Sequence, residues 1–207
     1  MAGALITIDG AGGVGKSTTA ARVADCLASA GTPVYLTTQP SRTALGTHIR
    51  EGVDTYRGMS LACLVAADRH HQQVSEIQPA LEAGTNVICD RYLPSSLVLQ
   101  VIDGVRPETV WQLNTDVRVP DVAVILRADP VLISTRLSVR GPHNRFEREP
   151  DSSVVRELEM FDEVAENLRR RGWPVHVIDC TGRRAGETAR AIADLVLPPL
   201  TDGRPAC

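Results

Sequence analysis

The sequence predicts an α/β fold in which a five-stranded parallel sheet carries helices on both faces. Short apolar runs alternate along the chain with segments whose apolar residues recur at helical spacing. A cluster of glycines directly follows the first of these runs and precedes the first helical segment. Hydrophobic residues make up 43% of the 207 positions, and we expect them to form a continuous core in a single domain of residues 1–207.

The first half of the chain is predicted to contain three strands and two helices. Leu5–Ile8 is a short apolar run that ends at Asp9 and the glycine cluster. Small and apolar residues then recur at helical spacing from Lys16 to about Ala30, and Gly31 and Pro33 stop this helix. The remaining elements are a strand at Val34–Thr37, a long helix at Ser60–Ala83 with Pro79 as a candidate break, and a strand at Val87–Cys89.

The second half is predicted to alternate in the same way. Two short helices, Ser95–Ile102 and Pro107–Thr115, precede a strand at Val122–Leu126. A helix at Pro130–Val139 is followed by the segment 140–150, which is charged, rich in turn residues and without an apolar face. The last elements are an amphipathic helix from Val154 to about Arg171, a strand at Val175–Ile178 and a helix from about Ala185 to Leu197.

Composition excludes several classes of protein. The net charge of -3 argues against a polynucleotide partner, which usually requires a basic surface. No apolar run reaches the roughly 18 to 20 residues that a membrane span needs. The N-terminus lacks the basic start and small-residue cleavage site of a signal peptide. We therefore expect a cytoplasmic protein that acts on a small molecule and binds neither nucleic acid nor membrane.

The glycine cluster carries a phosphate-binding motif. Residues 10–17, GAGGVGKS, match GxxxxGK[ST] at every position and lie between a predicted strand and a predicted helix. Backbone N–H groups of such a loop surround phosphate at a helix N-terminus, the lysine reaches the β- and γ-phosphates, and the hydroxyl of Ser17 holds Mg²⁺. We predict a P-loop NTPase fold that binds ATP and Mg²⁺. The predicted ATP-binding residues are Gly10, Ala11, Gly12, Gly13, Val14, Gly15, Lys16, Ser17 and Thr18.

Lys16 is the only lysine in the chain, and the other 21 basic residues are arginine. Codon bias in a GC-rich genome explains the excess of arginine, yet the single lysine stands where phosphate chemistry uses a compact ammonium. The missing lysines also exclude other P-loop classes. Small GTPases need a second lysine to recognise guanine, and the deviant Walker ATPases need one where this chain has Gly10. A kinase that uses ATP remains.

A second group of charged residues, apart from the P-loop, is expected to bind the phosphate of the acceptor. Asp90 and Arg91 follow the third predicted strand, at the edge where open α/β sheets bind ligands. Asp90 is a candidate second group for the metal ion. Arg91 and Arg69 offer planar guanidinium groups to an acceptor phosphate. The alternative for both arginines is a surface salt bridge.

Several of these segments, in this order, resemble the bacterial thymidylate kinases from the P-loop to the last helix. The matching segments are residues 9–17, residues 37–43 (TTQPSRT), residues 66–69 (AADR), residues 90–96 with Gln100 (DRYLPSS…Q) and residues 145–147 (RFE). The resemblance implies phosphorylation of dTMP to dTDP by ATP. It also implies a homodimer, formed through the long helix at Ser60–Ala83.

The resemblance implies roles for individual residues. Lys16, Asp9 and Arg91 are expected to be catalytic, with Asp9 and Arg91 near the acceptor phosphate. A short lid at about 140–150 is expected to supply the catalytic arginine, Arg145 or Arg148, because the P-loop contains none. Ser17 and Asp90 are the expected metal ligands. The expected substrate-binding residues are Asp9, Gln39, Arg42, Val65, Arg69, Arg91, Ser96, Leu99 and Gln100.

The chain departs from the family's pattern in the acceptor pocket. Val65 stands where the family has a phenylalanine that stacks on the base, and Leu99 where it has a tyrosine near the sugar. Thr38-Gln39 replaces Arg-Glu, and Arg42 replaces a glycine. Tyr92, Trp111 and Phe146 are rings that could substitute. Two alternatives to a dTMP kinase follow: a kinase with relaxed selection for another or a modified nucleotide, and a nucleotide-binding regulator without transfer activity.

Overall fold

The computed structural model describes residues 2–141, 144–148 and 151–197. Five parallel strands form one sheet in the order β2-β3-β1-β4-β5. Their bounds are β1 Leu5–Gly10, β2 Val34–Thr38, β3 Asn86–Asp90, β4 Val122–Arg127 and β5 Val175–Asp179. The fold class predicted from the sequence is confirmed, and each predicted strand lies within an observed one.

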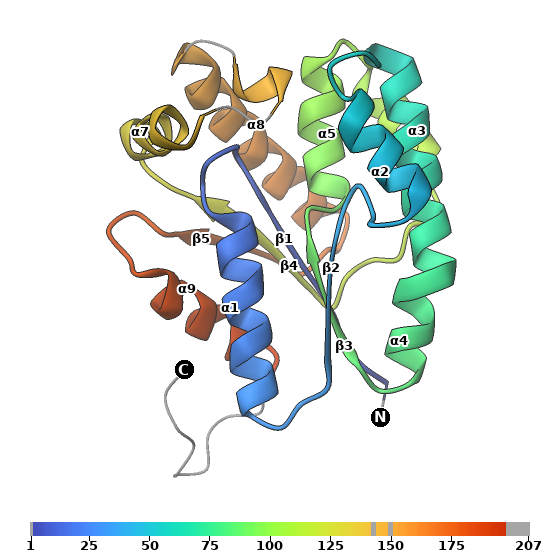
Figure 1. The fold of residues 1–207 in the computed structure, drawn as a ribbon, viewed down its shortest axis with the longest axis vertical. Coiled ribbons are helices and arrows are strands. Elements are labelled where there is room, and N and C mark those ends of the chain that lie inside the picture. Colours follow the sequence, from blue (N-terminus) through green and yellow to red (C-terminus); the bar gives the residue numbers. More distant parts are fainter. Residues whose placement is uncertain (1, 142–143, 149–150, 198–207) are drawn as a thin grey trace.

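Helices cover the sheet on both faces (Figure 1). Helix α1 (Lys16–Ser29) packs against α9 (Ala185–Ala193) on the face nearer the viewer, and α5 (Leu93–Ile102) packs against α8 (Asp151–Arg170) behind the sheet. The remaining elements are α2 Ala44–Gly52, α3 Gly58–Gln72, η1 Gln73–Ile77, α4 Gln78–Glu82, α6 Pro107–Leu113, α7 Pro130–Arg140 and η2 Arg145–Glu147. Within the described residues, no helix is both long enough and apolar enough to cross a membrane.

The register of the sheet places the two predicted functional segments side by side. Strand β1 is central and buried at every position, as expected for a parallel strand covered on both faces. Ile8 of β1 pairs with Asp90 of β3, and Gly10 pairs with Leu126 of β4. The glycine-rich loop therefore leaves the sheet next to the end of β3.

Two differences from the predicted helices have local causes. Helix α2 was not predicted, because the sequence between the loop at residues 37–43 and Ser60 was assigned no element. Thr43 begins α2 as its N-cap, and its hydroxyl accepts a hydrogen bond from the N–H of Gly46 at 3.3 Å. The long predicted helix is present as α3 and α4, joined by the π-helical turn η1 just before Pro79. Since proline has no N–H and crowds the preceding turn, a wider turn there is expected.

A small apolar cluster lies apart from the main core. It contains Ile49, Leu61 and Val65, and Phe146 of η2 packs against it. The lid predicted at about 140–150 is described only in part, because residues 142–143 and 149–150 lie outside the described residues. The described part of this segment reaches back to α2 and α3.

Candidate active site

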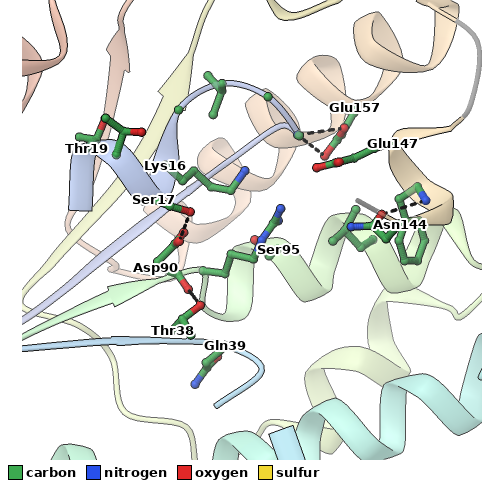
Figure 2. A pocket seen from close by; sticks show the side chains of 18 of the residues that line it. Lys16, Ser17, Thr19, Thr38, Gln39, Asp90, Ser95, Asn144, Glu147 and Glu157 are labelled. Atoms are coloured by element: carbon green, nitrogen blue, oxygen red, sulfur yellow. Dashed lines mark hydrogen bonds between the residues drawn. The ribbon is translucent and has the colours of Figure 1, made fainter. Parts of the chain in front are cut away.

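A cavity of about 960 Å³ extends from the glycine-rich loop to helices α2, α3 and α5. Most of the predicted site residues line it. They are Gly12, Gly13, Val14, Gly15, Lys16, Ser17, Thr18, Gln39, Val65, Arg69, Asp90, Arg91, Ser96, Leu99 and Gln100. Figure 2 shows Lys16 and Asp90 facing the same space, with Glu147 and Glu157 at its far side.

The shape of the P-loop depends on glycine at specific positions. Gly10, Gly13 and Gly15 have φ values of 139°, 76° and 108°, a region that L side chains rarely adopt. A Cβ atom on Gly10 would lie 2.5 Å from the carbonyl oxygen of Leu126. The sequence GAGGVGKS therefore folds as a tight loop whose end is the N-terminus of α1, a place where backbone N–H groups bind anions.

Lys16 is buried behind this loop and hydrogen-bonded to it. Its ammonium donates to the carbonyl oxygens of Gly10 at 2.8 Å and Ala11 at 2.7 Å. Burial, and to a smaller extent the charge of Arg91, lower the pKa of Lys16 to about 7. The charge of the lysine is thus poorly compensated, and a phosphate group in the cavity would stabilise it.

Ser17 and Asp90 form a set of oxygen donors at the mouth of the P-loop. The hydroxyl of Ser17 donates to Oδ2 of Asp90 at 2.5 Å. Oδ1 of Asp90 is buried and has no hydrogen-bond partner among the described residues. A hydroxyl beside a carboxylate with a free oxygen fits Mg²⁺, which prefers oxygen ligands and few protein groups.

Arg91 is aimed into the cavity by an unusual backbone conformation. Its φ of 72° makes it the one non-glycine residue with positive φ in the described part of the chain. Its N–H donates to the carbonyl oxygen of Ile8 at 2.9 Å, which holds the turn after β3 against β1. Nη1 of Arg91 is buried and without a partner among the described residues, so it is available to a ligand.

Arg69 is a buried cation whose hydrogen-bond partners are all neutral. It donates to Oε1 of Gln39 at 2.7 Å, Oδ1 of Asn114 at 2.5 Å, Oγ of Ser96 at 2.6 Å and the carbonyl oxygen of Tyr92 at 3.3 Å. Burial lowers the pKa of Arg69. These contacts fix the guanidinium at the acceptor end of the cavity without neutralising it.

Asp9 does not line the cavity. It is fully buried, and its Oδ1 accepts hydrogen bonds from the N–H of Tyr92, the N–H of Ser95 and the hydroxyl of Ser95, at 2.9, 3.0 and 2.7 Å. Burial raises the pKa of Asp9. The expectation that Asp9 lies near the acceptor phosphate stays a prediction: in the structure Asp9 anchors the start of α5, and Asp9, Gly10 and Ala11 are not among the residues that line the cavity.

The two lid arginines expected to be catalytic, Arg145 and Arg148, also lie outside the cavity lining. Arg145 donates to both carboxylate oxygens of Asp103, at 2.8 and 2.6 Å, and to the carbonyl oxygen of Val53 at 3.0 Å. Arg148 is exposed and pairs with Asp54. Arg42 is exposed and away from the cavity as well. Each of the two lid guanidinium groups has a carboxylate partner, and neither residue lines the cavity.

The cavity is also lined by charged residues that were not among the expected site residues, although Arg140 lay within the lid expected at about 140–150. Arg50 belongs to the unpredicted helix α2, so its position had no signal. Arg136 and Arg140 are on α7, and the Arg140 guanidinium donates to Glu147 at 2.5 Å. Glu157 of α8 accepts a hydrogen bond from the N–H of Gly12 at 3.2 Å, and burial raises its pKa. Glu157 belongs to none of the sequence motifs, so nothing in the sequence indicated this contact.

The fold and the cavity together define a class of protein. A parallel five-stranded sheet, a complete P-loop and a second cluster of cationic groups at the carboxyl edge of the sheet are the features of a P-loop nucleoside monophosphate kinase.

The particular family follows from comparison with known proteins. Residues 8–179 match the family model described as thymidylate kinase. The chain is 36% identical over 177 residues to a probable thymidylate kinase of Caldivirga maquilingensis, covering 82% of this chain and 83% of that protein. It is 35% identical over 195 residues to a thymidylate kinase of Clavibacter sepedonicus, covering 86% and 92%. The chain belongs to the thymidylate kinase family.

A solved structure supports the fold. The thymidylate kinase from Candida albicans superposes with a TM-score of 0.75 at 22% identity, covering 94% of this chain and 91% of that one. At this identity the likeness concerns the arrangement of the helices and strands.

Proposed function

We propose that the protein transfers the γ-phosphoryl group of ATP to dTMP, forming dTDP. The observation that carries the proposal is the course of the cavity, which joins the P-loop to the buried cation Arg69 through Arg91. One end can hold a nucleoside triphosphate and the other an acceptor with a phosphate and a base. Membership of the thymidylate kinase family supports dTMP as that acceptor.

The roles of the residues follow from their positions. The P-loop N–H groups and Lys16 would bind the phosphates of ATP, and Arg91 with Arg50 would bind the acceptor phosphate. Arg140 and Arg136 of α7 would meet the negative charge that accumulates on the phosphoryl group during transfer. Arg69, Ser96 and Gln100 would contact the nucleoside, since Oε1 of Gln100 is buried and has no partner among the described residues.

Ser17 and Asp90 are the residues that would hold Mg²⁺. When bound, the ion would neutralise phosphate charge and orient the phosphate oxygens of ATP. The hydrogen bond between the two residues keeps the P-loop and the end of β3 at a fixed separation before the substrates arrive.

The test is a coupled assay of ADP release with ATP, Mg²⁺ and a panel of dTMP, dUMP, UMP, CMP and 5-substituted analogues. We expect the highest kcat/KM for dTMP. Absence of turnover with every nucleotide in the panel would support the regulator instead.

A second candidate is a kinase with relaxed acceptor selection. Val65 and Leu99 both line the acceptor end of the cavity, and their aliphatic side chains leave more room than rings would. Apolar size differences give only about 10- to 200-fold discrimination. A preference for dTMP above a thousandfold in wild type, unchanged by Leu99→Tyr, would exclude this candidate.

We also propose a homodimer formed through α3 and the following turn η1. The exposed residues between Met59 and Gln78 include Cys63, Ala67 and Val74 but no Asp, Glu, Lys or Arg. Met59 is 50% and Val74 is 73% exposed, so apolar surface faces outward along the helix. An uncharged helical stripe of this kind is typical of a surface that a second protein copy covers.

A further inference from the structure

The acceptor end of the cavity has two different walls. Helices α2, α3 and α5 contribute the aliphatic side chains of Ile49, Leu61, Val65 and Leu99. The turn η2 of the lid segment contributes the ring of Phe146, which packs against Ile49, Leu61 and Val65. An aromatic ring therefore packs against the small apolar cluster that contains Val65.

Tyr92 is the other aromatic residue among the described residues that line the cavity. It is fully buried, and its hydroxyl donates to the carbonyl oxygen of Arg118 at 3.0 Å. Its ring centroid lies 6.5 Å from that of Trp173, within the core. The ring of Tyr92 thus belongs to the core, whereas Phe146 is half-buried and open to the cavity.

Phe146 is held in place by its neighbour in the chain. The guanidinium carbon of Arg145 lies 4.1 Å from the ring centroid of Phe146, a cation–π distance. The same guanidinium makes the two hydrogen bonds to Asp103 at the end of α5. The side chains of Arg145 and Asp103 are only 15% and 9% exposed, so this ion pair is largely shielded from solvent.

Backbone contacts complete the attachment of this turn. The N–H of Arg145 donates to Oδ1 of Asp54 at 2.9 Å, and the side chain of Asn144 accepts from the N–H of Phe146 at 3.0 Å. Asp103 also accepts from the N–H of Gly58 at 2.5 Å, so one carboxylate joins the lid turn to the start of α3. The position of the Phe146 ring is therefore fixed from both the backbone and the side chain that precedes it.

We propose that Phe146 is the aromatic wall against which the base of the acceptor nucleotide packs, and that Arg145, held by Asp103, is a positioning residue for this ring. A nucleobase has apolar faces and polar edges, which match the Phe146 and Val65 walls and the polar groups of Arg69 and Gln100. The inference rests on the proposed nucleoside monophosphate kinase activity. It gives Arg145 a part in acceptor binding and none in phosphoryl transfer.

The experiment measures acceptor binding and catalysis separately. Calorimetry with dTMP in the absence of ATP gives the affinity, and the coupled assay gives kcat and both KM values. Phe146→Leu keeps the apolar contacts with Ile49, Leu61 and Val65 but removes the ring, and Phe146→Tyr keeps the ring. We expect Phe146→Leu to weaken dTMP binding about 10- to 100-fold, with kcat and the KM for ATP within threefold. Phe146→Tyr is expected to bind within threefold of wild type.

Arg145→Ala and Asp103→Asn are expected to show the same pattern as Phe146→Leu, weaker dTMP binding with kcat largely retained. Arg148→Ala is the matched control, because that arginine belongs to the same segment but faces solvent. The double variant Phe146→Leu with Val65→Phe returns a ring from the α3 side, and we expect it to recover most of the lost affinity. Thermal denaturation by circular dichroism confirms that each variant is folded.

Two results would overturn the proposal. One is dTMP affinity within twofold of wild type in folded Phe146→Leu. The other is a large loss of kcat with unchanged dTMP affinity in Arg145→Ala, which would return Arg145 to the transfer step. If wild type phosphorylated no nucleotide at all, the proposed function would fail, whereas the calorimetric measurement would still test the Phe146 wall.

Discussion

The hydroxyl of Ser17 lies 2.5 Å from Oδ2 of Asp90, which joins the first turn of α1 to the end of β3 by a single hydrogen bond. The other carboxylate oxygen has no partner among the described residues. We predict that Ser17→Ala and Asp90→Asn each raise the Mg²⁺ concentration needed for half-maximal activity by about 10- to 100-fold. Ser17→Thr retains the hydroxyl and should behave like wild type. A magnesium titration that does not shift in either variant would contradict the assignment.

Lys16 is predicted to take up a proton when ATP binds. Its pKa of about 7 in the free protein leaves it mostly neutral at pH 8, and the charge of bound phosphate favours the ammonium. Calorimetry in buffers of different ionisation enthalpy should detect uptake of nearly one proton at pH 8 and much less at pH 6. Lys16→Met provides the baseline that corrects for ionisation of ATP itself. Equal proton uptake by wild type and Lys16→Met would show that Lys16 is not the group that takes up the proton.

The same pKa shift affects stability, with a definite sign. The folded pKa of about 7 is below the ordinary value of 10.5, so the unfolded chain binds more protons between these pH values. The contribution of Lys16 to the free energy of unfolding therefore rises from pH 7 to 10.5. Lys16→Met should stabilise the free protein most at or below pH 7. The same variant should lower kcat, because it loses at least about 2–4 kcal/mol of transition-state stabilisation. Urea denaturation across this range tests the first part and steady-state kinetics the second.

Arg140 and Arg148 form a matched pair for locating the catalytic arginine. Arg140 lines the cavity and contacts Glu147, whereas Arg148 faces solvent and pairs with Asp54. We predict that Arg140→Ala lowers kcat by about 100-fold with a smaller change in KM. Arg148→Ala should leave both constants within twofold. The reverse ranking would show that the described arrangement of the lid is not the one used in transfer.

Asp9 is predicted to stabilise the fold and to have no direct part in transfer. Three hydrogen bonds converge on one of its oxygens, and hydrogen bonds to charged groups contribute about 1.5–3 kcal/mol each. Asp9→Ala should therefore lower the free energy of unfolding by on the order of 3 kcal/mol or more, and Asp9→Asn, which keeps an acceptor oxygen, by much less. Denaturant titrations measure both. A folded Asp9→Ala with wild-type stability but no activity would make Asp9 catalytic after all.

The raised pKa of Asp9 makes the difference in unfolding free energy between wild type and Asp9→Asn depend on pH. Burial raises this pKa above the ordinary value of 3.8, so the folded protein binds the extra proton between the two values. The contribution of Asp9 to stability falls as pH rises through that window and remains reduced at neutral pH. The difference in unfolding free energy between wild type and Asp9→Asn should follow this curve.

The proposed homodimer predicts that a charge placed on η1, the turn that follows α3, changes the mass of the protein in solution. Val74 of η1 is 73% exposed within the uncharged stripe, and a carboxylate there would have to be buried in the interface. Light scattering should give twice the chain mass for wild type and the chain mass for Val74→Glu. Val131→Glu, on the exposed side of α7, is the control and should stay dimeric. A wild-type monomer at micromolar concentration would refute the dimer.

The motif-bearing parts of the site were predictable because their chemistry is local. A P-loop needs glycine at positions with positive φ and a lysine at the start of a helix, and both requirements are visible as GAGGVGKS. Asp90 and Arg91 were predictable because parallel strands end at one edge of the sheet, which brings the ends of β1 and β3 together. Each of these inferences depends on few residues that are near one another in sequence.

The partners of long side chains could not be predicted in the same way. Arg145 and Asp103 are far apart in the chain, and nothing in either segment indicates that they form an ion pair. The lid was expected to direct Arg145 at a phosphate because charge density alone does not reveal which carboxylate a guanidinium will meet. Helix α2 was missed because a short helix behind a proline-containing loop gives a weak periodic signal, and Arg50 was missed with it.

The left-handed backbone of Arg91 lowers the stability of the fold, while the Arg91 side chain is expected to be needed for activity. A side chain with a Cβ atom costs about 1–2 kcal/mol in this conformation, and glycine avoids that cost. A selection for heat resistance alone would therefore enrich the variant Arg91→Gly. That variant would lack the guanidinium group that lines the cavity. Evolution towards a more robust protein has to find its gain at other positions as long as turnover is also selected.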